Sequence, residues 1–272
     1  MSKKRPDIPR FDHPIIETHC HLDYLDEEQL AQLLEQSREI GIERMVTIAV
    51  SADNLDKVLN LSRVDDRIWG TQGIHPHDAE QYNIDVEAQI IEQLDDPRML
   101  AVGEIGLDYH YDHADRKVQR EVFERQLQIA VDKQMPVVIH TREADEDTRA
   151  ILANFEQSLT HKGVIHSFTS GMELAQYCIE QGFKLGFNGI TTFNRAENVR
   201  DVVRSTPLEQ IVLETDSPYL APVPYRGRPN SPCYLPFIAQ RIADELEINV
   251  EELLKQTYRN SQALFFPREL DS

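Results

Sequence analysis

The sequence predicts one α/β domain, a (β/α)8 TIM barrel with a metal site at the C-terminal face of its strands. Eight short apolar segments, flanked by Gly or Pro, alternate with amphipathic segments along the chain. Such segments are typical of parallel strands buried on both faces, and eight units in about 250 residues match this barrel. A doubly wound open sheet is the alternative. It fits less well because no GxGxxG follows the first strand and metal-ligating residues follow many strands, not one switch point.

The elements follow in order along the chain. The first strand, at Ile15 and Ile16, leads into His19-Cys20-His21. Asp26 can cap a helix over 27–40, which Gly41 would end. The apolar segments predict further strands at 45–50, 68–74, 100–105, 137–139, 163–165, 184–187 and 211–213. Amphipathic spacing predicts helices at 54–62, 86–94, 117–133, 146–155, 172–179, 196–203, 235–246 and 250–265.

No linker, repeat or low-complexity run divides the chain. We therefore expect a barrel over residues 15–266, after an N-terminal extension (1–14) and before a short C-terminal tail (267–272). The Pro-dense stretch 218–236 is expected to form a long loop at the barrel mouth.

The composition favours a cytoplasmic protein. The three cysteines show no CxxC spacing, which argues against a disulfide framework. The polar N-terminus lacks the apolar region of a secretory signal, and no apolar run is long enough to span a membrane. The net charge of −19 repels nucleic acid at long range. We therefore expect no tight, stoichiometric nucleic-acid complex, although metal ions could hold such a substrate locally. No stable protein partner is inferred, and the protein is expected to be a monomer.

Six of the ten histidines stand at the ends of predicted strands, where the catalytic residues of a barrel gather. His19 and His21 are two residues apart, so their side chains share one face of a strand and form half of a metal site. Carboxylates join the imidazoles at these strand ends. The set comprises His19, His21, His75, His77, Glu104, His140, His166, Glu214 and Asp216.

The strongest ligand candidates are four imidazoles and two carboxylates: His19, His21, His140, His166, Glu104 and Asp216. They are too many for one tetrahedral ion and suit two divalent cations that share a carboxylate. Glu104 is the candidate bridge, because its strand lies between the two histidine pairs. Asp216 should join His19 and His21 once the barrel closes. Such a pair of cations activates water. The sequence contains no GxSxG motif that would indicate a covalent intermediate, so we predict hydrolysis by water. The ligand types favour Zn or Mn over Mg but do not name the metal.

The chain resembles the TatD family of metal-dependent hydrolases over almost its whole length. The matching motifs begin at Thr18-His19-Cys20-His21-Leu22-Asp23 and include Gly73-Ile74-His75-Pro76 and Gly103-Glu104-Ile105-Gly106-Leu107-Asp108. They continue with Ile139-His140-Thr141-Arg142-Glu143-Ala144, His166-Ser167-Phe168-Thr169, Gly189-Ile190-Thr191-Thr192-Phe193 and the run from Leu213 to Pro222.

The resemblance implies a deoxyribonuclease, of the 3′→5′ exonuclease type in some members, that binds its DNA substrate transiently. It implies one cation held by His19, His21, Glu104 and Asp216, and a second held by Glu104, His140 and His166. Asp216 would also be the general base. The resemblance places the expected substrate contacts at His75, Arg142, Arg226 and Arg228.

Five positions depart from the family pattern: Glu17, Ser170, Gly171, Pro229 and Ser231. The ligand positions are intact, so these departures bear on substrate preference. Two other functions stay open: hydrolysis of esters or amides, such as aminoacyl-tRNA, on the same site, and an idle metal-binding barrel that serves as an interaction platform. The parts played by His77 and Glu214 also stay open.

Overall fold

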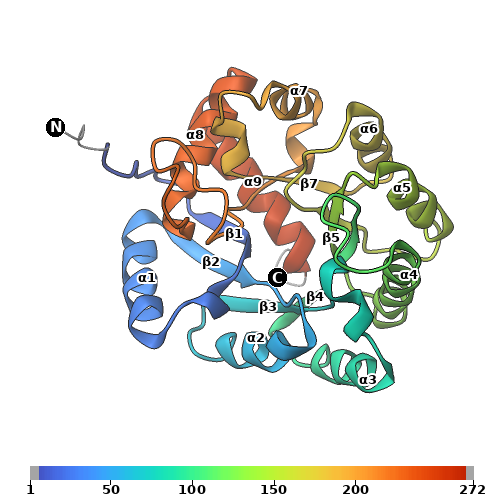
Figure 1. Cartoon of the computed structure of the whole chain (residues 1–272). Coiled ribbons are helices and arrows are strands. Elements are labelled where there is room, and N and C mark those ends of the chain that lie inside the picture. The colour runs from blue at the N-terminus through green and yellow to red at the C-terminus, as the bar shows by residue number, and fades with distance from the viewer. Residues whose placement is uncertain (1–5, 268–272) are drawn as a thin grey trace.

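The computed structural model describes residues 6–267, and its centre is one sheet of eight parallel strands (Figure 1). Each strand pairs with the next one along the chain, so the spatial order equals the sequence order. This order and the alternation with helices confirm the predicted barrel over the open-sheet alternative. The strands are β1 (Ile15–Cys20), β2 (Ile42–Thr47), β3 (Ile68–Gln72), β4 (Met99–Asp108), β5 (Val137–Arg142), β6 (Gly163–Ile165), β7 (Lys184–Phe187) and β8 (Ile211–Leu213).

The helices surround the strands as a ring (Figure 1). Those between strands are α1 (Glu27–Ile40), α2 (Leu55–Leu61), α3 (Ile84–Gln93), α4 (Arg116–Lys133), α5 (Asp145–Asn154), α6 (Met172–Glu180) and α7 (Glu197–Ser205). After β8 come α8 (Leu235–Leu246) and α9 (Val250–Phe265). The predicted N-cap of α1 is confirmed: Asp26 accepts from the Gln29 backbone N–H, and Gly41 ends the helix at φ +92°.

Two apolar layers hold the barrel together. The larger lies between the strands and the outer helices, and the smaller fills the barrel itself. Leu264, Phe265 and Phe266, at the end of α9, join the strand residues of the inner layer. These apolar side chains of α9 close one end of the barrel. The polar side chains of the candidate site gather at the opposite end, where the strands finish. The inner strand residues are Ile16, Val46, Ile48, Ala101, Val138, Val164 and Val212.

The barrel closes between β1 and the segment that follows β8. The Asp216 N–H donates to the His19 carbonyl oxygen (2.9 Å), and the His21 N–H donates to the Ser217 carbonyl oxygen (2.9 Å). The hydroxyl of Thr18 donates to the Leu213 carbonyl oxygen (2.8 Å). This seam brings the first strand of the chain next to its last one.

Glu17, one of the departures from the family pattern, lies in this seam. One oxygen of its buried carboxyl accepts both the His19 N–H (3.0 Å) and the Thr215 N–H (2.9 Å). Burial raises the pKa of Glu17 to about 8, although both hydrogen bonds oppose that rise. Glu17 therefore links the two edges of the barrel in its protonated form at neutral pH.

Several strands are longer than the apolar pattern predicted. β1 includes His19, β5 includes His140, and β4 extends from Ile105 to Asp108. The backbone ladder between β4 and β5 continues through these polar residues, as far as the pair Asp108 and Arg142. Gly106 permits this close approach: its φ is +138°, and a Cβ there would lie 1.9 Å from the His140 carbonyl oxygen.

The described part of the N-terminal extension is attached to the barrel. The backbone N–H groups of Asp12 and His13 donate to the carboxylate of Glu251 on α9. Residues 1–5, and all of the predicted tail except residue 267, lie outside the described residues. Between residues 6 and 267, no helix has the length and apolar character needed to cross a membrane.

Candidate metal centre

Glu104 lies buried among histidines at the C-terminal ends of the strands. Its Oε2 is 3.3 Å from Nε2 of His19. Its Oε1 is 2.8 Å from Nε2 of His166 and 3.1 Å from Nδ1 of His140. The two oxygens thus face histidines from different strands, although the rings of His19 and His166 stack at 3.8 Å, and contact with several ligand candidates is the position expected of a shared carboxylate.

Asp216 completes the side of the centre formed by β1. Its Oδ1 lies 3.3 Å from Nε2 of His21 and 3.6 Å from Nε2 of His19. The hydrogen bonds of the seam fix this position, because the backbone of Asp216 pairs with that of His19. The structure therefore brings together all six residues that the sequence proposed as ligands.

The imidazoles and carboxylates of the centre shift one another's pKa values. Burial acts to raise the pKa of Glu104, but His166, His75 and His140 lower it well below its usual range. Burial acts to lower the pKa of His166, but Glu104 and Glu214 raise it well above its usual range. Burial likewise opposes ionisation of Asp216, whose pKa is nevertheless lowered by His21, His19 and His166. Positive charge close to the carboxylates is therefore needed to keep them ionised.

Several buried polar atoms of the centre have no hydrogen-bond partner among the described residues. They include both ring nitrogens of His19, Nδ1 of His166 and Oε2 of Glu214. A buried polar atom without a partner costs about 1–3 kcal/mol, which a bound cation would offset. The donor set also fits, because imidazole and carboxylate together suit Zn, Mn or Fe. Within residues 6–267, three groups have ligand atoms close enough to hold an ion: His19, His21 and Glu104; His19, His166 and Glu214; and His75, Glu104 and His140.

His75, predicted to contact substrate, lies in the centre itself. Its Nε2 is 3.4 Å from Oε1 of Glu104. Burial lowers the pKa of His75 to about 4, so the ring is neutral at pH 7. Because Nδ1 accepts the backbone N–H of His77 (3.1 Å), the ring proton belongs on Nε2, facing Glu104.

Asp108 belongs to the site, although sequence reasoning gave it no role. Its Oδ2 lies 2.9 Å from Nε2 of His140 and 3.1 Å from Nε2 of His77. His77 is therefore connected to the centre indirectly, by way of Asp108 and His140. The available signal was spacing: Asp108 follows Glu104 by four positions, and such positions share one face of a regular strand.

Glu214 supports the opposite side of the centre. Its Oε1 accepts the Ser167 N–H (2.7 Å) and the side-chain amide of Asn188 (3.1 Å), and lies 3.6 Å from Nδ1 of His166. Glu214, whose part the sequence left open, thus stands behind His166. Asn188, at the end of β7, was not among the predicted residues.

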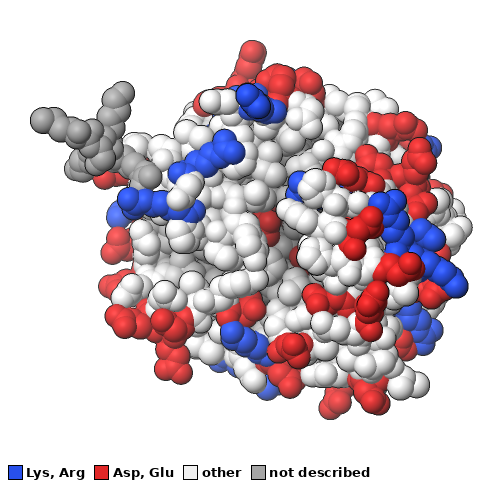
Figure 2. All heavy atoms as spheres, viewed as in Figure 1, with Lys and Arg blue, Asp and Glu red and all other residues white. Residues whose placement is uncertain are grey.

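The three predicted arginines are exposed around the centre, Arg142 at the end of β5 and the other two on the loop after β8. The guanidinium of Arg142 lies 5.4 Å from the Tyr111 ring, and that of Arg226 lies 4.1 Å from the Phe193 ring. Arg228 lies on the same loop as Arg226. Figure 2 shows basic side chains over this loop and acidic atoms in the hollow at the middle of the face.

The model of the family described as TatD related DNase matches residues 16–266. This chain belongs to the TatD family. It is 33% identical over 252 residues to the uncharacterized metal-dependent hydrolase YabD of Bacillus subtilis, a match that covers 92% of this chain and 98% of that protein. The match to the TatD 3′-5′ ssDNA/RNA exonuclease of Erwinia amylovora is also 33% identical and covers 86% of this chain and 92% of that one.

The solved structure of the TatD homologue YjjV from Escherichia coli aligns with a TM-score of 0.86 at 27% identity. The alignment covers 92% of this chain and 97% of that chain. These relatives and the grouped histidines and acids identify a metal-dependent hydrolase of the TatD family.

Proposed function

We propose that this TatD-family hydrolase is a deoxyribonuclease that shortens single-stranded DNA from its 3′ end with two divalent cations. The observation that carries the proposal is the position of Glu104, whose two oxygens face His19 on one side and His140 and His166 on the other. A relative named as a 3′-5′ exonuclease, similar over 86% of this chain, supports the choice of substrate.

The cations would be held in two sets that share Glu104. His19, His21 and Asp216 would complete one set, and His140 and His166 the other. When bound, such a pair of ions activates water and neutralises charge on the phosphate. Zn, Mn and Mg are the candidates to test.

Asp216 is proposed as the general base. Its lowered pKa keeps the carboxylate ionised at neutral pH, so it can accept the proton that the attacking water loses. It is the ligand candidate that combines partial exposure, 15% of its side chain, with contact to both His19 and His21. Arg142 and Arg228 would bind backbone phosphates, for which the planar guanidinium is suited, and Arg226 would also contact the substrate.

The test incubates metal-reconstituted protein with 5′-labelled single-stranded DNA and, separately, with aminoacyl-tRNA. Stepwise shortening from the 3′ end, reduced about 100- to 10,000-fold in Asp216→Asn, is the expected result. The matched control is Asp201→Asn, on α7, which should retain wild-type activity. Deacylation without DNA cleavage would instead identify an ester hydrolase, and inactivity on both would favour the interaction platform.

A further inference from the structure

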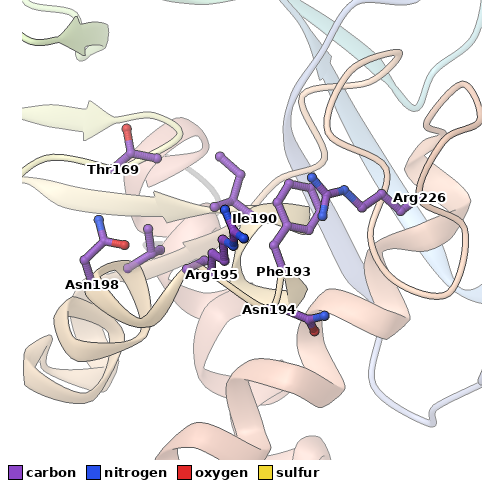
Figure 3. A pocket seen from close by; sticks show the side chains of 9 residues that line it. Thr169, Ile190, Phe193, Asn194, Arg195, Asn198 and Arg226 are labelled. Carbon is purple, nitrogen blue, oxygen red and sulfur yellow. The ribbon is translucent and has the colours of Figure 1, made fainter.

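A hollow of about 530 Å³ lies beside the metal centre, within the range of known ligand sites. Three loops form it: the one after β6, the one between β7 and α7, and the one between β8 and α8 (Figure 3). Phe193 and Arg226 come from separate loops and pack against each other in its wall, with the guanidinium 4.1 Å from the ring centre.

The hollow is joined to the centre by a short chain of contacts. Its wall residue Ile190 donates its N–H to Oδ1 of Asn188 (3.1 Å). The amide of Asn188 donates to Glu214, which stands 3.6 Å from His166. Another wall residue, Thr169, follows His166 by three positions. The hollow therefore adjoins the side of the centre that His166 and Glu214 form.

The charge of the hollow suits an anion, in contrast to the acidic molecule as a whole. Arg195 and Arg226 line it, and none of the described residues in its wall is acidic. The nearest acid in sequence, Glu197, is already paired with Arg200 (2.8 Å) and Arg204 (2.6 Å).

A neighbouring hollow of about 790 Å³ is much less suited to an anion. It shares the wall residues Thr169 and Ile190 with the first. It carries two arginines, Arg116 and Arg142, but also four acidic residues: Glu143, Asp145, Glu146 and Asp147. The charge of the wall residues therefore makes the hollow at Arg226 the better anion site of the two.

We propose that the hollow at Phe193 and Arg226 is a nucleotide subsite for the strand whose bond lies at the metal centre. This inference rests on the proposed function. A base stacks on the outer face of the Arg226 guanidinium, which the Phe193 ring supports from behind. The exposed amides of Asn194 and Asn198 hydrogen-bond to the edge of that base. Arg195 pairs with the adjacent phosphate.

The test compares the binding of dGMP with that of deoxyribose 5-phosphate, which has the phosphate but no base. Calorimetry on the metal-reconstituted protein should show about tenfold tighter binding of dGMP, or about 1.4 kcal/mol, because only dGMP has a base that stacks. Arg226→Ala should abolish this preference, and Phe193→Leu, which keeps an apolar side chain without the ring, should reduce it.

The matched control is Arg149→Ala. Arg149 is also an exposed arginine over an aromatic ring, 5.3 Å from Tyr177, but it lies among the outer helices α5 and α6. It should keep the full preference for dGMP. Melting curves of all variants identify any that fail to fold. Equal affinity of the wild type for both compounds, or an unchanged preference in Arg226→Ala, would overturn the subsite.

A second measurement separates this inference from the proposed function. With single-stranded DNA as substrate, Arg226→Ala and Phe193→Leu should raise KM about tenfold, with a smaller fall in kcat. If the wild type cleaves no DNA, the proposed function fails, while the comparison of dGMP with deoxyribose 5-phosphate still decides whether the subsite exists.

Discussion

Asp108 connects two histidines at the edge of the metal centre. Burial acts to raise its pKa, but His140 and His77 lower it, so the carboxylate stays ionised. It accepts from Nε2 of His140, which leaves Nδ1 of that ring facing Glu104 at 3.1 Å. Carboxylates that hold the far nitrogen of a ligand histidine fix both its orientation and its tautomer.

We expect Asp108→Asn to weaken the binding of divalent cations by roughly 10- to 100-fold, because His140 would no longer be held by a charged acceptor. Competition with a chelator measures this affinity directly. Asp112→Asn is the matched control, since Asp112 is an exposed residue of the neighbouring loop that pairs with Arg116 (2.7 Å). Equal affinities in the two variants would show that Asp108 does not orient the ligand.

The sequence predicted those candidate residues that are of a metal-ligating type and also stand at the end of a predicted strand. His19, His21, Glu104, His140, His166 and Asp216 all stand at the ends of apolar segments, and the structure brings them together. Asp108 and Asn188 were missed because their partners, His140 and Glu214, lie on neighbouring strands. Those contacts depend on strand register, which the sequence does not display.

At the scale of elements, the seam between β1 and β8 is the feature that assembles the site. Glu17 accepts one N–H from each side of it. The apolar pattern located each described strand and α-helix, but not the short 3-10 helices or how far the strands continue through polar residues. Backbone hydrogen bonds between strands do not depend on side-chain polarity. The strands β1, β4 and β5 therefore extend beyond the apolar segments that predicted them.

The raised pKa of Glu17 makes the stability of the seam depend on pH. With a pKa of about 8 in the folded state and 4.5 as the ordinary value, the folded protein binds more protons than the unfolded chain between these limits. Its contribution to stability is therefore complete below pH 4.5 and is lost as the pH rises through 8.

We expect the free energy of unfolding of the wild type, relative to Glu17→Gln, to fall as the pH rises from about 5 to about 8. The slope should approach 1.4 kcal/mol per pH unit, since one proton is involved. Urea titrations of both proteins with chelator present provide the measurement. A difference between the two proteins that does not change with pH would mean that Glu17 is already ionised in the folded state.

At the scale of the whole molecule, cations should stabilise the fold, because the centre joins β1, β4, β5 and the segments after β6 and β8. Saturation at about 100 times the dissociation constant adds about 2.7 kcal/mol. For a chain of this size we expect the melting temperature to rise by roughly 5–10 °C over the chelated protein. Glu104→Gln should lose most of that rise in a thermal denaturation series. A full rise in this variant would place the stabilising cation elsewhere.

The net charge of −19 makes unassisted binding to DNA weak. Without divalent cations, we expect little binding of single-stranded DNA at about 150 mM salt, and an affinity that changes little with oligonucleotide length. Fluorescence anisotropy with chelated protein measures this. Tight binding under these conditions would contradict the expectation. It would mean that basic side chains bind DNA without cations, despite the many acidic side chains in Figure 2.

The seam also has a consequence for protein synthesis. His19 and His21 lie near the start of the chain, whereas Asp216 follows β8, the last strand to be made. A nascent chain still on the ribosome at residue 200 holds most of the ligand candidates, but neither Asp216 nor the edge that pairs with β1. The finished centre therefore forms only after nearly the whole polypeptide has emerged.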